Sequence, residues 1–90
     1  MKANVQLTAL KAAKGGVSIC EHELKEAIRS LKQKYQDAGA GWRDAQYQKL
    51  GGIISECCDA LNQPISELNK CQESLESLIG AVNDYDNTDL

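Results

Sequence analysis

Apolar residues recur at steps of three and four along nearly the whole chain, a spacing that places them on one face of an α-helix. In the first half the series runs Leu7, Leu10, Ala13, Val17, Cys20, Leu24, Ala27 with Ile28, Leu31, Tyr35 and Ala38. In the second half it runs Tyr47, Leu50, Ile54, Cys57 with Cys58, Leu61, Ile65, Leu68, Cys71, Leu75, Leu78 with Ile79, Val82 and Tyr85. The pattern predicts an all-α protein with two long amphipathic helices.

The two predicted helices are separated by Gly39-Ala40-Gly41. Glycine commonly adopts the left-handed conformation just after a helix, and Asp44 is a suitable N-cap for the helix that follows. We therefore predict one domain over residues 1–90, with a helix at 8–38, a turn at 39–43, a helix at 44–85 and a tail at 86–90. So short a connection makes the helices antiparallel neighbours in a hairpin.

Two glycine pairs and a proline interrupt the helical pattern. Gly15-Gly16 either lie within the first helix or end a short first segment. Gly51-Gly52 would let another backbone approach closely. Pro64 removes one helical hydrogen bond, but the apolar spacing keeps its phase across it, so we predict a bend rather than a break.

The apolar face of the second helix is wider than one neighbouring helix needs. Adjacent apolar pairs such as Ile53-Ile54 and Leu78-Ile79 lie about 100° apart around a helix, and a chain this short tends to need support from a partner. We predict that two hairpins form a four-helix bundle. The core and dimer face would consist of Leu24, Ile28, Leu31, Ile54, Cys58, Leu61, Ile65, Leu68 and Leu75. The alternative is a monomer in which residues 1–14 fold back to cover this face.

Charge is divided unevenly between the two halves. Residues 1–49 hold nine Lys/Arg and five Asp/Glu, a net of +4, whereas residues 50–90 hold one Lys and eight Asp/Glu, a net of −7. Halves of opposite sign attract when they fold together, and the acidic half argues against nucleic acid as a partner. No apolar run approaches the roughly 20 residues that span a membrane. The first ten residues lack the apolar core of a signal peptide, so export would use another route.

Little in the sequence favours catalysis or metal binding. The four cysteines form no C-x-x-C motif. Three of the four sit on the apolar seam, since the neighbours Cys57 and Cys58 share one position of the series, so we expect buried thiols that pack as small apolar side chains. Cys20 with Cys58 is the only conceivable intrachain disulfide. His22 lies between two glutamates and is expected on the surface. We therefore predict no enzyme, no catalytic residue, no cofactor and no metal site.

Two aromatic residues stand out. Trp42 follows Gly41 in the predicted turn, where it must pack against the end of the bundle or contact a partner. Tyr85 and Asp89 lie four residues apart, which is about one helical turn. Tyr85 is either the last core residue or part of a recognition motif.

These features together resemble the WXG-motif family, the early-secreted-antigen-like small proteins of bacterial type VII secretion. The resemblance covers nearly the whole chain: two amphipathic helices, the turn Trp42-Arg43-Asp44, and the tail motif Tyr85-x-x-x-Asp89. Asp44 stands where the family pattern has Gly.

The resemblance implies a homodimer, or a heterodimer with a related helical hairpin. The dimer would be made in the cytoplasm and secreted without a signal peptide by the type VII secretion ATPase. Trp42, Asp44, Tyr85 and Asp89 would be the recognition residues, with Trp42 of one subunit near its partner's Tyr85. Members of this family act as effectors, machine components or escorts for larger toxins.

Two other interpretations stay open. The wide apolar face also fits an intracellular helical adaptor or chaperone that escorts a larger partner, such as a secreted toxin. A thiol- or metal-dependent module would rest on the cysteines alone.

Overall fold

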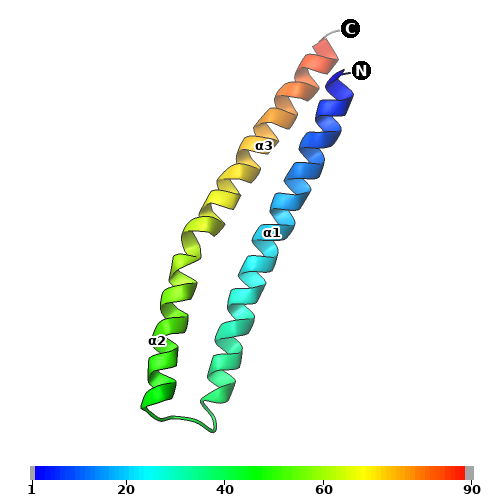
Figure 1. Cartoon of the computed structure of the whole chain (residues 1–90). Coiled ribbons are helices and arrows are strands. Elements are labelled where there is room, and N and C mark those ends of the chain that lie inside the picture. Colours follow the sequence, from blue (N-terminus) through cyan, green and yellow to red (C-terminus); the bar gives the residue numbers. More distant parts are fainter. Residues whose placement is uncertain (1, 89–90) are drawn as a thin grey trace.

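The computed structural model describes the backbone of residues 2–88 and the side chains of residues 5–85. Its helices are α1 (Lys2–Ala38), α2 (Ala45–Ala60) and α3 (Asn62–Thr88). Figure 1 shows α1 as one arm of a hairpin and α2 followed by α3 as the other, with both chain ends at the same tip. The molecule measures 70 × 17 × 13 Å, and residues 2–88 contain no strand. The predicted all-helical hairpin is confirmed.

The first arm is longer than predicted. α1 begins at Lys2 rather than at Thr8 and passes through Gly15-Gly16 without interruption. Glycine weakens a helix by about 1 kcal/mol relative to alanine, but α1 packs along most of its length against α3. Residues 2–14 continue α1, so the alternative in which residues 1–14 fold back over the apolar face is wrong for the described residues.

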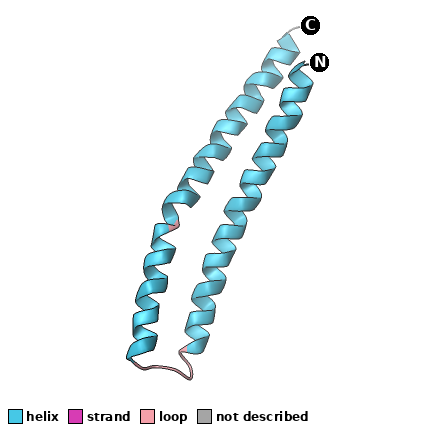
Figure 2. Cartoon of the chain, in the orientation of Figure 1, coloured by secondary structure: helices cyan, strands magenta, loops and turns pink. Residues whose placement is uncertain are grey.

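The second arm is interrupted at a single residue. Leu61 forms a one-residue turn between α2 and α3, and its N–H donates to the carbonyls of Cys57 and Cys58, both at 3.2 Å. Pro64 has no N–H to offer the carbonyl of Ala60, which accounts for a break in the helical hydrogen bonds at this point. Figure 2 shows the turn as a short loop within one continuous path. The predicted helix at 44–85 is therefore two helices, and α3 extends to Thr88.

The arms meet along a seam in which residues alternate at steps of three and four. In α1 its partly or fully buried members are Leu7, Leu10, Lys14, Val17, Glu21, Leu24, Ile28 and Tyr35. In the other arm they are Tyr47, Gly51, Ile54, Cys58, Leu61, Ile65, Leu68, Gln72, Leu75, Ile79 and Val82. The seam follows a seven-residue repeat, as in helices that pack at a small crossing angle.

Several predicted seam positions are displaced by one residue. The seam takes Lys14 and Glu21, while Ala13 and Cys20 are exposed. One residue corresponds to about 100° around a helix, so an error of one position moves a side chain off the contact. Of the nine residues predicted for the core and dimer face, eight lie on the seam within one hairpin, and Leu31 is 43% exposed.

Candidate functional site

Two tyrosines join the arms next to the connection between α1 and α2, residues 39–44, which we call the elbow. The rings of Tyr35 and Tyr47 are stacked, with centroids 4.2 Å apart and planes 7° from parallel. The Tyr35 hydroxyl donates to the Tyr47 carbonyl at 2.8 Å, and the Tyr47 hydroxyl donates to the Tyr35 carbonyl at 2.7 Å. The pKa of Tyr35 is raised mainly because its hydroxyl is shielded from solvent, and the contact with Tyr47 raises this pKa further. We call this reciprocal pair the tyrosine clasp.

Two glycines make room for the clasp. A Cβ on Gly39 would lie 2.8 Å from Tyr47 Cζ, and a Cβ on Gly51 would lie 2.7 Å from Tyr35 Cζ. Both distances are shorter than carbon atoms tolerate. No described glycine has a positive φ, so the expected left-handed glycine after the first helix is wrong. Gly39 and Gly51 instead serve the close approach of a ring from the same chain, and Gly52 faces open space.

Asp44 organises the elbow. Its Oδ1 accepts a hydrogen bond from the Tyr47 N–H at 3.0 Å, which confirms the predicted N-cap of α2. That bond and a hydrogen bond with the Trp42 side chain lower the pKa of Asp44. The Trp42 ring also packs against the Tyr47 ring in a tilted arrangement, with the ring centroids 5.6 Å apart, yet Trp42 is 40% exposed. The Asp44 carboxylate therefore both caps α2 and holds an exposed tryptophan in place.

A polar layer crosses the seam near the middle of α1. Glu21 is buried, and its carboxylate accepts a hydrogen bond from the Gln72 amide of α3. Lys25 reaches Glu21 at 3.0 Å, and Lys14 forms an ion pair with Glu76 at 3.7 Å. Sliding one arm along the other would separate the buried carboxylate from its amide donor, so this layer favours one register.

The cysteines are placed differently from the prediction. All four are free; Cys58 is buried in the seam, whereas Cys20, Cys57 and Cys71 are exposed. The expectation of three thiols packed in the apolar series is therefore wrong, because Cys20, Cys57 and Cys71 lie one residue away from seam positions. The conceivable Cys20–Cys58 disulfide is not formed. His22 is exposed, as predicted.

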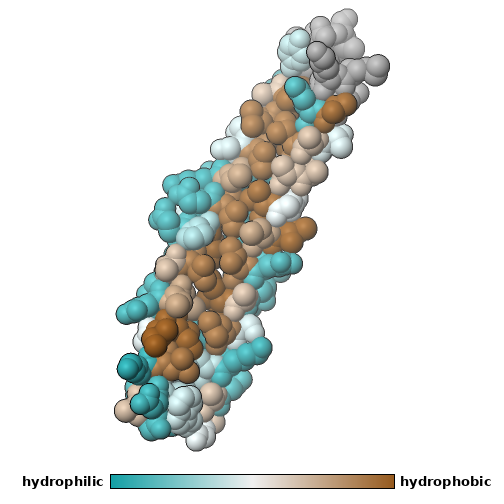
Figure 3. All heavy atoms as spheres, viewed as in Figure 1, coloured by the Kyte–Doolittle hydropathy of each residue, from teal (hydrophilic) through white to brown (hydrophobic). Residues whose placement is uncertain are grey.

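Exposed apolar residues that lie next to seam positions in the sequence form a second apolar surface, which we call the apolar flank. In the second arm it consists of Leu50, Ile53, Cys57, Ala60, Pro64, Cys71, Leu78, Ala81 and Tyr85, and in α1 of Ala9, Ala13, Gly16, Cys20 and Ala27. All are exposed. Figure 3 shows a hydrophobic band that runs along this face between the arms, bordered by hydrophilic residues. The signal was present in the sequence, since Leu50, Cys57, Pro64, Cys71, Leu78 and Tyr85 occur at every seventh residue.

The opposite surface, which we call the polar flank, is charged and hydrophilic. It carries Lys11, Ser18, Lys25 and Lys32 of α1, and Gln48, Ser55, Asn62, Asn69, Glu76 and Asn83 of the second arm. In an antiparallel helix pair, equivalent positions beside the two seams fall on the same side. The shallow hollows on the two flanks differ in the same way. Ala9 and Leu78 border a hollow on the apolar flank, whereas Lys11 and Ser18 border a hollow on the polar flank.

The hairpin by itself covers little apolar surface. Among the described apolar side chains only Tyr47 and Cys58 are buried, and Ile53, Leu78 and Tyr85 are each more than half exposed. The chain exposes 6733 Å², whereas a compact monomer of its mass exposes about 5,200 Å². The excess, on the order of 1,500 Å², is enough for a standard protein interface, which covers about 800 Å² of each partner.

The predicted recognition residues lie at the two tips. Trp42 and Asp44 are in the elbow, and Tyr85 is 68% exposed near the opposite tip, where the apolar flank ends. Asp89 lies outside the described residues. One hairpin therefore keeps Trp42 and Tyr85 nearly a full molecular length apart.

No family model matches the chain, and neither the curated proteins nor the solved structures contain a match. The described helices hold no segment long and apolar enough to cross a bilayer. Within the described residues, no cluster of three or more His, Cys, Asp or Glu side chains is positioned to hold a metal ion.

Proposed function

We propose that this chain is a non-enzymatic, WXG-like small protein that is secreted without a signal peptide as a dimer. It would be a substrate or component of a bacterial type VII secretion system. The observation that carries the proposal is the exposed apolar flank, which extends along both arms. Another helical hairpin is the partner that best fits it, because its own flank would supply two antiparallel helices of matching length.

The recognition role of the two tips follows from the same dimer. Trp42 is held at the elbow by Asp44 and Tyr47 with much of its ring still exposed, and Tyr85 projects at the other tip. Two hairpins packed with inverted ends would bring the elbow of each beside the other's Tyr85. The secretion ATPase would then read Trp42, Asp44, Tyr85 and Asp89 as one composite signal.

Secretion from a host with a type VII system tests this function. An epitope-tagged chain should appear in the medium, and Tyr85→Ala and Trp42→Ala should each retain it in the cells. Lys70→Ala is the matched control, since Lys70 is exposed on α3 away from both tips and both flanks. Cell-associated protein is measured alongside to separate retention from degradation. Export of Tyr85→Ala at the wild-type level would remove the role assigned to this residue.

The apolar flank also fits a second function, that of an adaptor or chaperone that escorts a larger partner such as a secreted toxin. In that case the flank would be covered by an amphipathic helix of the partner. Light scattering of the pure chain separates the two functions. A stable homodimer at micromolar concentration supports the first, whereas a monomer or an aggregate that a larger partner rescues supports the second.

A further inference from the structure

The contacts between the arms place Cys20 and Cys71 at the same level of the hairpin. The Glu21 carboxylate of α1 accepts a hydrogen bond from the Gln72 amide of α3, and each cysteine directly precedes one of these two residues in the chain. Cys58, the only disulfide partner that the sequence suggested for Cys20, lies in α2, thirteen positions closer to the elbow than Cys71. The structure therefore gives Cys20 a different neighbouring thiol.

The two thiols also lie on the same side of the hairpin. Both cysteines directly precede a seam position, and in an antiparallel helix pair such equivalent positions fall on one side of the seam. A hollow on that side is bordered by both arms, by Ala9 of α1 and by Leu78, seven positions after Cys71. Both thiols are exposed and free. The apolar flank therefore carries one thiol from each arm at the same level.

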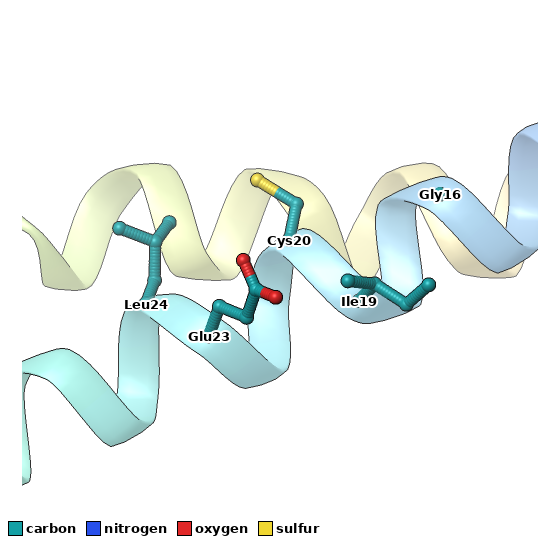
Figure 4. Close-up of a pocket in the computed structure, with 5 residues that line it drawn as sticks. All are labelled: Gly16, Ile19, Cys20, Glu23 and Leu24. Carbon is teal, nitrogen blue, oxygen red and sulfur yellow. The ribbon is translucent and has the colours of Figure 1, made fainter.

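The sulfur of Cys20 is open to a ligand. Figure 4 shows the Cys20 side chain standing out from α1, with its sulfur toward Leu24 and with Gly16 one turn away. The hollow beside it is lined by Gly16, Ile19, Glu23 and Leu24. Gly16 has no side chain, and no atom lies within 4 Å of the position that a Cβ would occupy there. Nothing from that turn therefore covers the sulfur.

The spacing of two packed helices favours an ion between the thiols over a disulfide. A disulfide needs Cα atoms within about 7 Å of each other, whereas the axes of packed helices lie about 8–10 Å apart, and positions beside a seam are farther apart than positions within it. A metal ion between two thiolates adds two bonds of about 2.3 Å in place of one S–S bond of about 2.05 Å, so it spans a wider separation.

The number of donors selects the class of ion. Zinc sites in proteins usually have four ligands, whereas the part of the chain that the structure describes has no group of three or more His, Cys, Asp or Glu side chains that could hold a metal ion. Copper(I) is a soft ion that prefers thiolates, and two thiolates in a linear arrangement satisfy it. We propose that Cys20 and Cys71 together bind one copper(I) ion across the arms of the hairpin. Each thiol gives up its proton on binding, and no electron is transferred.

This site goes beyond the proposed function, because it depends neither on secretion nor on a dimer. A partner that covers the apolar flank would also enclose the ion and keep water and oxidants away from it. The ion would join α1 to α3 through two residues that are fifty-one positions apart in the chain. Since only the folded hairpin brings these residues together, bound copper(I) should also raise the stability of the fold.

Copper(I) titration of the reduced, full-length chain tests the site, with bicinchoninate as the competing chromophoric ligand and oxygen excluded. The parent protein is Cys57→Ser, which removes the adjacent thiol pair of α2 and keeps Cys20 and Cys71. It is compared with the parent carrying Cys20→Ser or Cys71→Ser. The matched control is Cys20→Ser/Cys71→Ser, which keeps the adjacent thiols Cys57 and Cys58. Circular dichroism checks that each variant is equally helical before copper is added.

The parent should bind one copper(I) ion per chain. Loss of either thiol should weaken binding by roughly 100-fold or more, since loss of an outer-shell partner alone costs about 10–100-fold. Unchanged affinity after Cys20→Ser or Cys71→Ser would overturn the site. Binding by the matched control as tight as that of the parent would overturn it as well, because any two cysteines of the chain would then suffice.

Dibromobimane tests the proximity of the thiols without a metal, because it becomes fluorescent only when both of its bromomethyl groups have reacted with thiols. The parent should give a fluorescent product that migrates as a monomer on a denaturing gel, and neither serine variant of the parent should do so. A fluorescent product of dimer mass would place the second thiol on another copy, which overturns the site within one chain and leaves the proposed dimer standing. A parent that reacts without fluorescence would show that Cys20 and Cys71 lie too far apart to share an ion.

Discussion

Replacing Gly51 by alanine tests whether the tyrosine clasp holds the elbow end of the hairpin together. Alanine stabilises a helix interior by about 1 kcal/mol relative to glycine, so propensity alone favours the change. At this position the new Cβ would lie 2.7 Å from Tyr35 Cζ, and the ring cannot turn aside without leaving Tyr47. A neutral hydrogen bond contributes about 1 kcal/mol and an aromatic pair about 0.5–1.5 kcal/mol. We therefore expect Gly51→Ala to be about 1 kcal/mol less stable than wild type.

Gly52→Ala is the matched control, because a Cβ there has no atom within 4 Å. It should gain about 1 kcal/mol from helix propensity, so the two variants should differ by about 2 kcal/mol. For a chain of this size that difference is on the order of 10 °C in Tm, measured by circular dichroism at one fixed protein concentration. In a Tyr35→Ala background, Gly51→Ala should become as favourable as Gly52→Ala. Equal stabilisation by both alanines in the wild-type background would refute the clasp.

Two further predictions concern the elbow and the seam. Hydrogen bonds lower the pKa of Asp44 below its ordinary value of 3.8, so the cap stabilises the fold above about pH 4 and is lost as the pH falls through the folded-state pKa. Wild type should thus be more stable than Asp44→Ala at pH 7, and urea denaturation should show the advantage shrinking below pH 4. In the seam, Gln72→Leu should lower stability by about 1–3 kcal/mol despite its added apolar surface, because it deprives the buried Glu21 carboxylate of its amide donor. The double variant Glu21→Leu/Gln72→Leu should recover at least that loss in the same assay, and failure to recover would show that the pair does not act as a unit.

Local spacing and chemistry identified the helices, the elbow and the Asp44 cap. Apolar steps of three and four specify a helix through contacts within a few residues, and an aspartate before a helix caps it wherever the helix lies in the fold. The prediction started the first helix at residue 8 and left open that Gly15-Gly16 end a short first segment, because glycine locally weakens a helix. Packing of α1 against α3 overrides that local preference.

The candidate site was harder to locate, because the apolar series in the sequence includes residues of both the seam and the apolar flank without distinguishing them. Cys57 and Cys58 are adjacent and equally apolar, yet the first lies on the apolar flank and the second is buried in the seam. Likewise, Glu21 is buried and Cys20 is exposed, whereas hydrophobicity alone predicts the opposite. A difference of one residue rotates a side chain by about 100°, so only the position of the opposing arm decides which stripe it covers.

The sequence by itself determined the helices, the turn and the presence of more apolar surface than one pair of helices covers, because these depend on residue type and local spacing. The tertiary structure decided the register of the arms, the reciprocal fit of Tyr35 and Tyr47 against two glycines, and the division of the apolar residues between seam and flank. Those features depend on contacts between residues far apart in the chain, whose geometry is set only once the arms have packed.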